Sequence, residues 1–245
     1  MNLVIDIGNT RVKSAIFDHK NQIIESLSFT HEKAIREIKF LIQKNHPKNA
    51  LISEVGKRIE GLEKLFEQNN INFFYLNTHL KLPFENRYQT SQTLGADRIA
   101  LVSGAIFRQP QGNKLIIDAG TCITYDFIDE NNIYHGGAIS PGINLRFKSL
   151  HSYTDKLPLL QASKIENIEL IGSSTNDSII SGVLYGIINE IEGFIVKYNL
   201  KYKNLTVFLT GGSQKVLDRY IKNKIFVNSK FLLLEGMNYI LNLNK

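Results

Sequence analysis

The chain has 245 residues, of which 43% are hydrophobic and 21% charged, with a net charge of +6 and one cysteine, Cys122. This composition is typical of a globular protein, and the length allows one large domain or two of ordinary size. A single cysteine excludes an intrachain disulfide, which agrees with a reducing compartment. The chain enters a predicted strand directly after Met1-Asn2, and no apolar run approaches the roughly 20 residues of a membrane span. We therefore expect a cytoplasmic protein with no membrane partner.

The positive charge does not indicate a nucleic-acid partner. Lysine and arginine are scattered along the chain, and the sequence has no zinc-finger, helix-turn-helix or aromatic RNA-binding signature. The six histidines lack metal-ligand spacing, and there is neither a Walker-type phosphate loop nor a Gly-x-Ser-x-Gly motif. These absences exclude several common kinds of site.

The first predicted strand, from Leu3 to Ile7, carries a carboxylate to a tight turn. The run is apolar apart from Asp6, and Gly8-Asn9 reverses the chain into a second strand, Val12 to Phe17. Backbone amides of residues 8–10, the Thr10 hydroxyl and the Lys13 ammonium could contact phosphate oxygens. Because a carboxylate repels phosphate, Asp6 needs a cation between them. This pattern suggests a nucleotide carried with Mg²⁺.

Alternating strands and helices follow this hairpin. The pattern predicts strands over 22–29, 49–53 and 71–76, and helices over 31–44 and 57–68. The inward faces of the two helices are predicted to be Ile35, Ile38, Leu41 and Ile42, and Ile59, Leu62, Leu65 and Phe66. Three antiparallel strands followed by alternating helices and strands is the order of the ribonuclease H-like fold, which is duplicated in actin-like and sugar-kinase ATPases.

An irregular stretch over 77–93 leads to a predicted helix from Leu94 to Phe107. Asp97 falls in the first turn of this helix, where the helix dipole favours a carboxylate. One interpretation makes Asp97 a helix-start acid beside a surface partner, Arg98. Its position just before the second acidic turn, described next, favours the other interpretation, a functional carboxylate.

The second half of the chain repeats the first hairpin. Residues 114–122 again give an apolar strand, an Asp, a small residue, a Gly and a polar turn, and Asp118 lies 118 − 6 = 112 residues after Asp6. Asp-x-Gly is ordinary hairpin chemistry in a single copy, but two copies after buried strands favour an internal duplication. The polar segment 108–113 is the predicted linker. We therefore expect two ribonuclease H-like α/β domains, 1–110 and 111–245, with a cleft between them.

The rest of the second half continues the pattern. We expect a strand over 133–139, a helix ending near Leu150, a long helix from Ser178 to Asn199 after the capping region 172–177, and a strand over 205–210 before Gly211-Gly212. A short strand near 225–227 and a helix over 231–243 close the chain.

Taken in order, these motifs resemble the type III pantothenate kinase family. The matching positions, each weak alone and specific together, span nearly the whole chain: Asp6-x-Gly8-Asn9-Thr10-x-x-Lys13; Tyr88; Leu94-Gly95-Ala96-Asp97-Arg98; Asp118-x-Gly120-Thr121-x-x-Thr124-x-Asp126; Gly136-Gly137-x-Ile139-x-Pro141-Gly142; Thr154-x-x-Leu157-Pro158; Thr175; and Thr210-Gly211-Gly212. Cys122 departs from the family pattern, in which a small residue such as alanine is expected.

The resemblance implies an ATP-dependent transfer of phosphate to the 4′-hydroxyl of pantothenate, the first step of coenzyme A synthesis. It implies Asp97 as the general base and Asp118 as the ligand of a monovalent cation, K⁺ or NH₄⁺. A second ion, the Mg²⁺ carried by ATP, is expected at Asp6. The remaining implied contacts are, for ATP, Asp6, Ile7, Gly8, Asn9, Thr10, Arg11, Val12, Lys13 and Thr121, and, for pantothenate, Tyr88, Gly95, Ala96, Asp97, Arg98 and Thr175.

The family resemblance also implies a homodimer, for which the helix 178–199 is the candidate contact. Two alternatives remain open. One is a non-catalytic regulatory member, since some relatives are named as accessory factors in transcription, and the other is a kinase or phosphatase of the same fold with another small substrate. The intact Asp6, Lys13, Asp97, Arg98 and Asp118 argue against the regulatory alternative.

Overall fold

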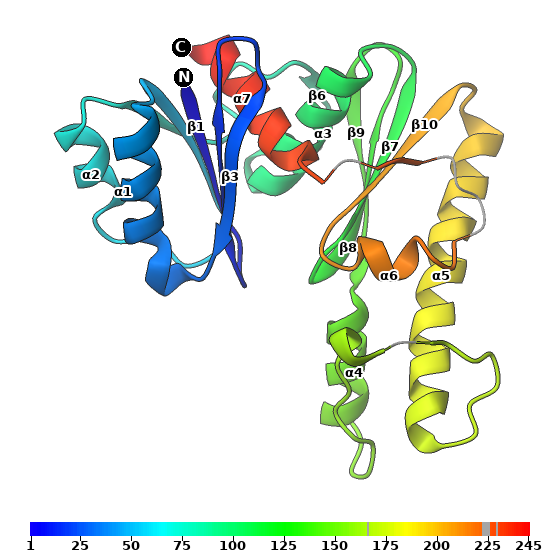
Figure 1. Ribbon diagram of the computed structural model, residues 1–245. Helices are drawn as coiled ribbons and strands as arrows, with labels where there is room; N and C mark the ends of the chain where they lie inside the picture. The colour runs from blue at the N-terminus through cyan, green and yellow to red at the C-terminus, as the bar shows by residue number, and fades with distance from the viewer. Residues whose placement is uncertain (166, 222–225, 229) are drawn as a thin grey trace. The chain divides into compact units, whose positions relative to one another are not determined.

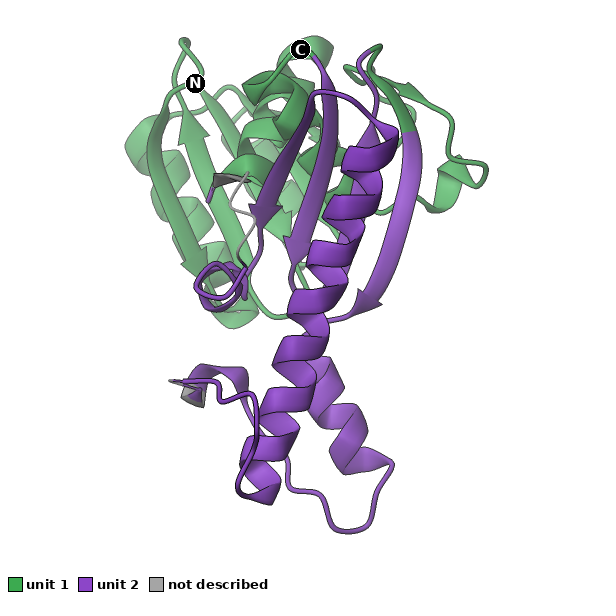
Figure 2. Ribbon diagram, turned by 90° about the vertical axis from the view of Figure 1, so that its right-hand side faces the viewer, with its two compact units in different colours: residues 1–111, 131–134, 231–245 green, residues 112–130, 135–230 purple. Residues whose placement is uncertain are grey.

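The computed structural model describes residues 1–165, 167–221, 226–228 and 230–245 (Figure 1). It divides into two compact units. The first unit comprises residues 1–111, 131–134 and 231–245, and the second comprises 112–130 and 135–230 (Figure 2). The division near residue 111 coincides with the predicted linker, whereas residues 231–245 group with the first unit. The assignment of two domains over 1–110 and 111–245 stays a prediction.

The first unit is built on a five-stranded sheet in the order β3-β2-β1-β4-β5. Strands β1 and β2 form the predicted hairpin, and β4 runs parallel to β1. The bounds agree with the predictions to within two residues: β1 Asn2–Ile7, β2 Val12–Phe17, β3 Ile23–Phe29, β4 Asn49–Glu54 and β5 Asn72–Tyr75. The sequence order therefore predicted this sheet correctly.

Helices α1 (Ala34–Asn45) and α2 (Leu62–Gln68) cover the face of this sheet to which Leu3, Ile5 and Ile7 point. Two details of the prediction were wrong. Ile35 is 37% exposed, because the inward position at the start of α1 is taken by Ala34 after the 3-10 turn η1 (His31–Lys33). Residues 57–61 are not helical; α2 begins at Leu62, after Gly61, whose φ of 81° is left-handed.

The other face of the sheet carries α3 (Ala96–Arg108) and α7 (Leu232–Asn244). These helices pack against each other, and α7 also packs on β1 and β4. Between α2 and α3, the predicted irregular stretch contains only a two-residue strand, β6 (Glu85–Asn86), and a 3-10 turn, η2 (Ser91–Thr93). Asp6 lies on this face, because side chains alternate along β1.

The second sheet has the order β11-β10-β7-β8-β9-β6. Read from the other end and without the edge strand β6, this order is β9-β8-β7-β10-β11, which corresponds strand by strand to β3-β2-β1-β4-β5 in the first sheet. The strands are β7 Asn113–Ala119, β8 Cys122–Ile128, β9 Ile133–Pro141, β10 Leu205–Thr210 and β11 Phe226–Asn228. The predicted duplication is thus confirmed in topology; the predicted strand near 225–227 lies partly outside the described residues.

The helices of the second unit are α4 (Ile143–Ser152), α5 (Thr175–Lys201) and α6 (Gln214–Leu217), with the 3-10 turn η3 (Ala162–Lys164). The helix α5 starts three residues before the predicted position, and the Ser174 hydroxyl caps it by accepting from the Asp177 amide. By length and composition alone α5 could cross a membrane. Eight of its residues are buried, however, and seven of them, all except Ser181, belong to a hydrophobic core that also contains residues of β7, β8 and β10.

Candidate active site

Asp6 lies between two polar partners on the neighbouring strands. It is opposite Lys13 in the antiparallel pair of β1 with β2 and opposite Ser53 in the parallel pair with β4. Directly opposed residues point to the same face of a sheet, so the three side chains gather there. Asp6 is only 4% exposed, whereas Lys13 is exposed.

This environment changes the acidity of Asp6. Burial raises its pKa from 3.8 to about 6; Lys13 lowers it, the carboxylate of Asp97 raises it, and the Ser53 hydroxyl lowers it. Asp6 and Asp97 therefore interact electrostatically within the first unit. Oδ1 of Asp6 is buried without a hydrogen-bond partner in the described part of the chain. An unpaired carboxylate oxygen of this kind suits a divalent cation.

The turn between β1 and β2 presents free backbone donors. The Gly8 amide donates within the turn to the Arg11 carbonyl at 3.1 Å, and its expected role in phosphate binding stays a prediction. Among the described residues, the amides of Asn9 and Thr10 have no acceptor. Both residues are exposed, and their donors suit an anion. The Arg11 guanidinium instead holds Ser28, with Nε 2.8 Å from Oγ.

A glycine after β4 supports this turn. A Cβ atom at Gly56 would lie 2.3 Å from the Gly8 carbonyl oxygen, so any side chain there would displace the turn. The Gly56 amide donates to the carbonyl of Ile7 at 2.7 Å. Neither Ser53 nor Gly56 was predicted as part of the site.

Asp97 is held at the first turn of α3. Its Oδ1 accepts a hydrogen bond from the Arg98 amide at 2.8 Å, which fixes the carboxylate at the positive end of the helix. A Cβ atom at Gly95 would lie 2.5 Å from the same oxygen. Residue 95 must therefore be a glycine for the carboxylate to keep this position.

Arg98 lies over an aromatic group formed by Phe84, Tyr88 and Tyr134. The guanidinium carbon is 5.4 Å from the Tyr88 ring centroid, a cation–π distance, and the Tyr88 and Tyr134 centroids are 6.2 Å apart. The Asn86 side chain fixes the backbone here by accepting from the Tyr88 amide at 2.9 Å. The structure thus brings together, in the first unit, five of the six residues expected to bind pantothenate: Tyr88, Gly95, Ala96, Asp97 and Arg98.

Asp118, in the second unit, occupies the position equivalent to Asp6. It is opposite Thr124 on β8 and Thr210 on β10. The Thr124 hydroxyl oxygen is buried with no hydrogen-bond partner within the described residues. A Cβ atom at Gly211, whose φ is 100°, would lie 2.4 Å from Oδ1 of Asp118. Carboxylate and hydroxyl oxygens of this kind suit a hard cation.

The predicted nucleotide contact Thr121 lies in the two-residue turn beside Asp118. Its carbonyl accepts from the Gly142 amide at 3.0 Å, and a Cβ atom at Gly142 would lie 2.4 Å from the Gly120 carbonyl oxygen. Glycine at the start of α4 therefore lets that helix approach the turn. Cys122, the next residue, is exposed. Across the described residues, no group of three or more His, Cys, Asp or Glu residues could hold a metal ion.

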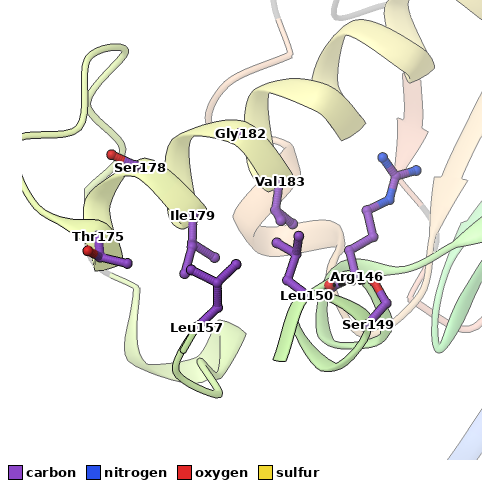
Figure 3. A pocket seen from close by; sticks show the side chains of 9 residues that line it. All are labelled: Arg146, Ser149, Leu150, Leu157, Thr175, Ser178, Ile179, Gly182 and Val183. Carbon is purple, nitrogen blue, oxygen red and sulfur yellow. Dashed lines mark hydrogen bonds between the residues drawn. The ribbon is translucent and has the colours of Figure 1, made fainter. Parts of the chain in front are cut away.

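A cavity of about 660 Å³ lies between α4 and α5. Of the residues that line it, the sequence indicated Thr175, as a pantothenate contact, and Leu157, as part of a family motif. Figure 3 shows Val183 facing Leu150 and Ile179 facing Leu157 across it. At one end, Arg146 bonds Glu190, which also accepts from Tyr125 at 2.8 Å. No sequence motif marked these residues, because they meet only through the packing of α4 on α5.

Comparisons of the fold define the class of protein first. A conserved protein from Campylobacter jejuni, assigned to the Baf family of transcriptional activators, is similar over 98% of this chain and 97% of its own, with a TM-score of 0.60 and 24% identity. The ADPNP-bound activator of 2-hydroxyisocaproyl-CoA dehydratase from Clostridium difficile is similar over 99% and 93%, with a TM-score of 0.57 and 12% identity. The fold is the duplicated ribonuclease H-like fold of actin-like ATPases and sugar kinases, as the sequence predicted.

Sequence comparison identifies the family within that class. The model of the type III pantothenate kinase family matches residues 2–197. Proteins named type III pantothenate kinase from Flavobacterium psychrophilum and Phocaeicola vulgatus are 46% and 40% identical; the first match covers 97% of both chains, and the second covers 100% of this chain and 99% of its relative. The chain belongs to the type III pantothenate kinase family.

Proposed function

We propose that this chain transfers the γ-phosphoryl group of ATP to the 4′-hydroxyl of pantothenate in the first step of coenzyme A synthesis. The observation that supports the proposal, beyond family membership, is that Asp97 lies near enough to Asp6 to raise its pKa, beside a turn in which the Asn9 and Thr10 amides have no acceptor among the described residues. A kinase needs a carboxylate next to a phosphate site, and the first unit supplies both.

Asp97 acts as the general base. Because one of its oxygens is occupied by the Arg98 amide, the other is available to accept the proton of the substrate hydroxyl. The alcohol oxygen then forms a bond to the γ-phosphorus as the bond to the β-phosphate oxygen breaks, and ADP leaves. Phosphoryl transfer depends mainly on positioning and charge neutralisation, so a well-positioned carboxylate suffices.

The β1–β2 turn binds the phosphates. Phosphate oxygens accept hydrogen bonds from the amides of Asn9 and Thr10 and from the Thr10 hydroxyl, and the Lys13 ammonium neutralises part of their charge. An ATP-dependent kinase implies a divalent ion such as Mg²⁺, and the unpaired Oδ1 of Asp6 is the atom that would face it. When bound, that ion neutralises charge on the phosphates.

Arg98 and Tyr88 bind the carboxylate of pantothenate. A guanidinium stacked on an aromatic ring is held in place with few degrees of freedom, and it can pair with a carboxylate such as that of pantothenate. Gly95 and Ala96 let the substrate approach the start of α3. Thr175, in the second unit, stays a predicted pantothenate contact.

Asp118 serves a monovalent cation, K⁺ or NH₄⁺. Its support is the oxygen set of Asp118, Thr124 and Thr210, in which the Thr124 hydroxyl has no hydrogen-bond partner among the described residues. Thr121 contacts ATP from the adjoining turn.

We also propose a cytoplasmic homodimer. The surface that supports it is apolar and exposed in the second unit: Tyr153 is 88% exposed and Ile171 85%. Leu200, on the long helix first considered for this contact, is 84% exposed.

The test is a coupled assay of ADP release from Mg-ATP with pantothenate, run with K⁺ and then with Na⁺ alone. Pantothenate-dependent turnover that needs K⁺ supports the reaction and the cation together. Folded protein that gives no turnover in either buffer favours the regulatory alternative or a different acceptor alcohol. Of these, the regulatory alternative has less support, because the relatives are named as kinases.

A further inference from the structure

The last helix of the chain, α7, touches both elements that carry the acidic residues of the site. It supplies none of the residues assigned to substrate or nucleotide, and it lies beyond residue 197, where the match to the family model ends. It nevertheless groups with the first unit, whose other strands and helices come from the start of the chain.

The contact of α7 with α3 is made by backbone atoms. A Cβ atom at Gly236 would lie 1.8 Å from the Ala100 carbonyl oxygen, and one at Gly104 would lie 2.1 Å from the Leu232 carbonyl oxygen. The two helices cannot slide or rotate at this crossing without a collision or a gap. Ala100 is three residues after Asp97, which is roughly 4.5 Å along a helix.

An ion pair and two rings hold the same crossing. Arg108, at the end of α3, forms a double hydrogen bond with Glu235, whose side chain is only 10% exposed. The rings of Phe107 and Tyr239 have centroids 5.6 Å apart. These contacts fix the rotation of α3 about its axis.

The contact of α7 with β1 is made by side-chain amides. Asn2, the first residue of β1, donates to Oδ1 of Asn238 at 2.8 Å and to Oδ1 of Asn242 at 3.0 Å. Both α7 residues donate in turn to Oδ1 of Asn21, in the loop after β2. Asn2 lies on the same face of β1 as Asp6, because both are even-numbered positions of the strand.

We propose that α7 is the spacer that sets the separation of Asp97 from Asp6, and that Gly236, Glu235 and Asn238 are positioning residues for phosphoryl transfer. The inference rests on the proposed function, in which Asp97 is the base. Asp6 and Asp97 are 91 residues apart in sequence, and α7 links the helix of one to the strand of the other through two contacts, at Gly236 and Asn238, that are only two residues apart.

A change at either contact should therefore reduce turnover without changing nucleotide affinity. In Gly236→Ala the added methyl group pushes α3 away from α7. Because a displacement of about 1 Å can cost roughly 10²-fold in rate, we expect kcat to fall between roughly tenfold and 10²-fold, with the KM for ATP unchanged. The matched control is Gly193→Ala in α5, where a Cβ atom would meet nothing within 4 Å.

The Arg108–Glu235 ion pair gives a second test, which can be carried out even if Gly236→Ala does not fold. Arg108→Glu and Glu235→Arg should each lower kcat, and the double variant should recover much of it because the pair is restored in reverse. The control is the exposed pair Arg58–Glu63 of the same unit, at 2.7 Å, whose reversal should leave kcat unchanged.

Hydrogen exchange of the amides of residues 95–98 supplies a readout that does not depend on activity. We expect faster exchange at the start of α3 in Gly236→Ala and in the single reversals, measured well below each melting temperature, and wild-type exchange in the controls. Variants that lose thermal stability while keeping wild-type kcat and wild-type exchange would overturn the inference, because α7 would then only stabilise the fold.

Failure of the proposed function looks different. It would show as a wild-type enzyme without pantothenate-dependent turnover, or as an Asp97→Asn variant with full turnover. In either case the exchange rates still decide whether α7 positions α3.

Discussion

The two acidic hairpins share a scaffold and differ in charge. In each, an Asp stands two residues before a glycine, and it is flanked by an antiparallel strand on one side and a parallel strand on the other. The partners of Asp6 are Lys13 and Ser53, whereas those of Asp118 are Thr124 and Thr210. Four residues, 8–11, link the first pair of strands, and two, 120–121, link the second. With the roles proposed above, one backbone would serve a polyanion in one copy and a cation in the other.

The shared part extends to single hydrogen bonds. The Gly56 amide donates to the Ile7 carbonyl, and the Ser213 amide donates to the Ala119 carbonyl. In both hairpins the donor lies three residues after the residue that faces the Asp on the parallel strand, and the acceptor lies one residue after the Asp. The hydrophobic faces also correspond at the same offset: Leu3, Ile5 and Ile7 match Leu115, Ile117 and Ala119. The two hairpins therefore differ in the length of the turn and in the side chains beside the Asp, and these side chains are the natural targets of mutation.

The largest effect on turnover is expected from substitution of Asp97, the carboxylate near the first hairpin. Asp97→Asn keeps the shape of the base but cannot accept the proton, so kcat should fall roughly 10²- to 10⁴-fold. Binding of ATP, followed by calorimetry, should persist because the β1–β2 turn is untouched. Near-normal turnover would remove Asp97 from the role of base.

A pH titration tests the burial of Asp6. Since folding raises the pKa of this group from 3.8 to about 6, the folded state holds the proton more tightly than the unfolded state. The free energy of unfolding of the ligand-free protein should therefore fall as pH rises from about 4 to about 6, by at most about 3 kcal/mol. Asp6→Asn should lose this slope. Denaturant unfolding of both proteins across that pH range measures it, and equal slopes would refute the assignment.

Substitutions of the residues opposite Asp6 and Asp118 test whether the charge of Lys13 matters for ATP binding. Lys13→Thr gives Asp6 the kind of partner that Asp118 has, and it should weaken ATP binding by about 1.5–3 kcal/mol, since one charge-assisted contact to phosphate is lost. Thr124→Val, at the equivalent position, should leave the ATP Kd nearly unchanged. The comparison fails if both substitutions weaken ATP binding equally.

The smallest effect concerns the second hairpin. Asp118→Asn removes the charge that would hold a monovalent cation, so the activation of turnover by K⁺ should become weaker. The measurement is a K⁺ titration of kcat at constant ionic strength. A titration curve like that of the wild type would place the cation elsewhere.

Local patterns were enough to predict both hairpins and the placement of Asp97 at a helix start. The sequence placed Asp6 in a buried strand and Lys13 near the turn that follows it, and the structure adds that the two residues lie opposite each other. The first turn of α3 was likewise marked by Gly95 and the apolar run after it. The family resemblance added roles to these residues, and those roles stay predictions.

Nonlocal contacts account for what was not predicted. Ser53 and Gly56 look ordinary in sequence, and they enter the site only because β4 runs parallel to β1. The inward position expected of Ile35 was lost to Ala34, since the 3-10 turn shifted the phase of the helix. The packing of α7 on α3 depends on two glycines 132 residues apart, Gly104 and Gly236, and no local pattern connects them.

The membership of α7 in the first unit has a consequence for the order of events during synthesis. A ribosome releases β1 to α3 first, but the helix that completes their packing emerges only after the second unit, residues 112–130 and 135–230, has been made. The first unit therefore cannot reach its final packing until α7 has been made, although domains generally fold from the N-terminus as they are made. A nonsense mutation anywhere before residue 231 would leave the first unit unfinished, even where every residue of its strands has been made.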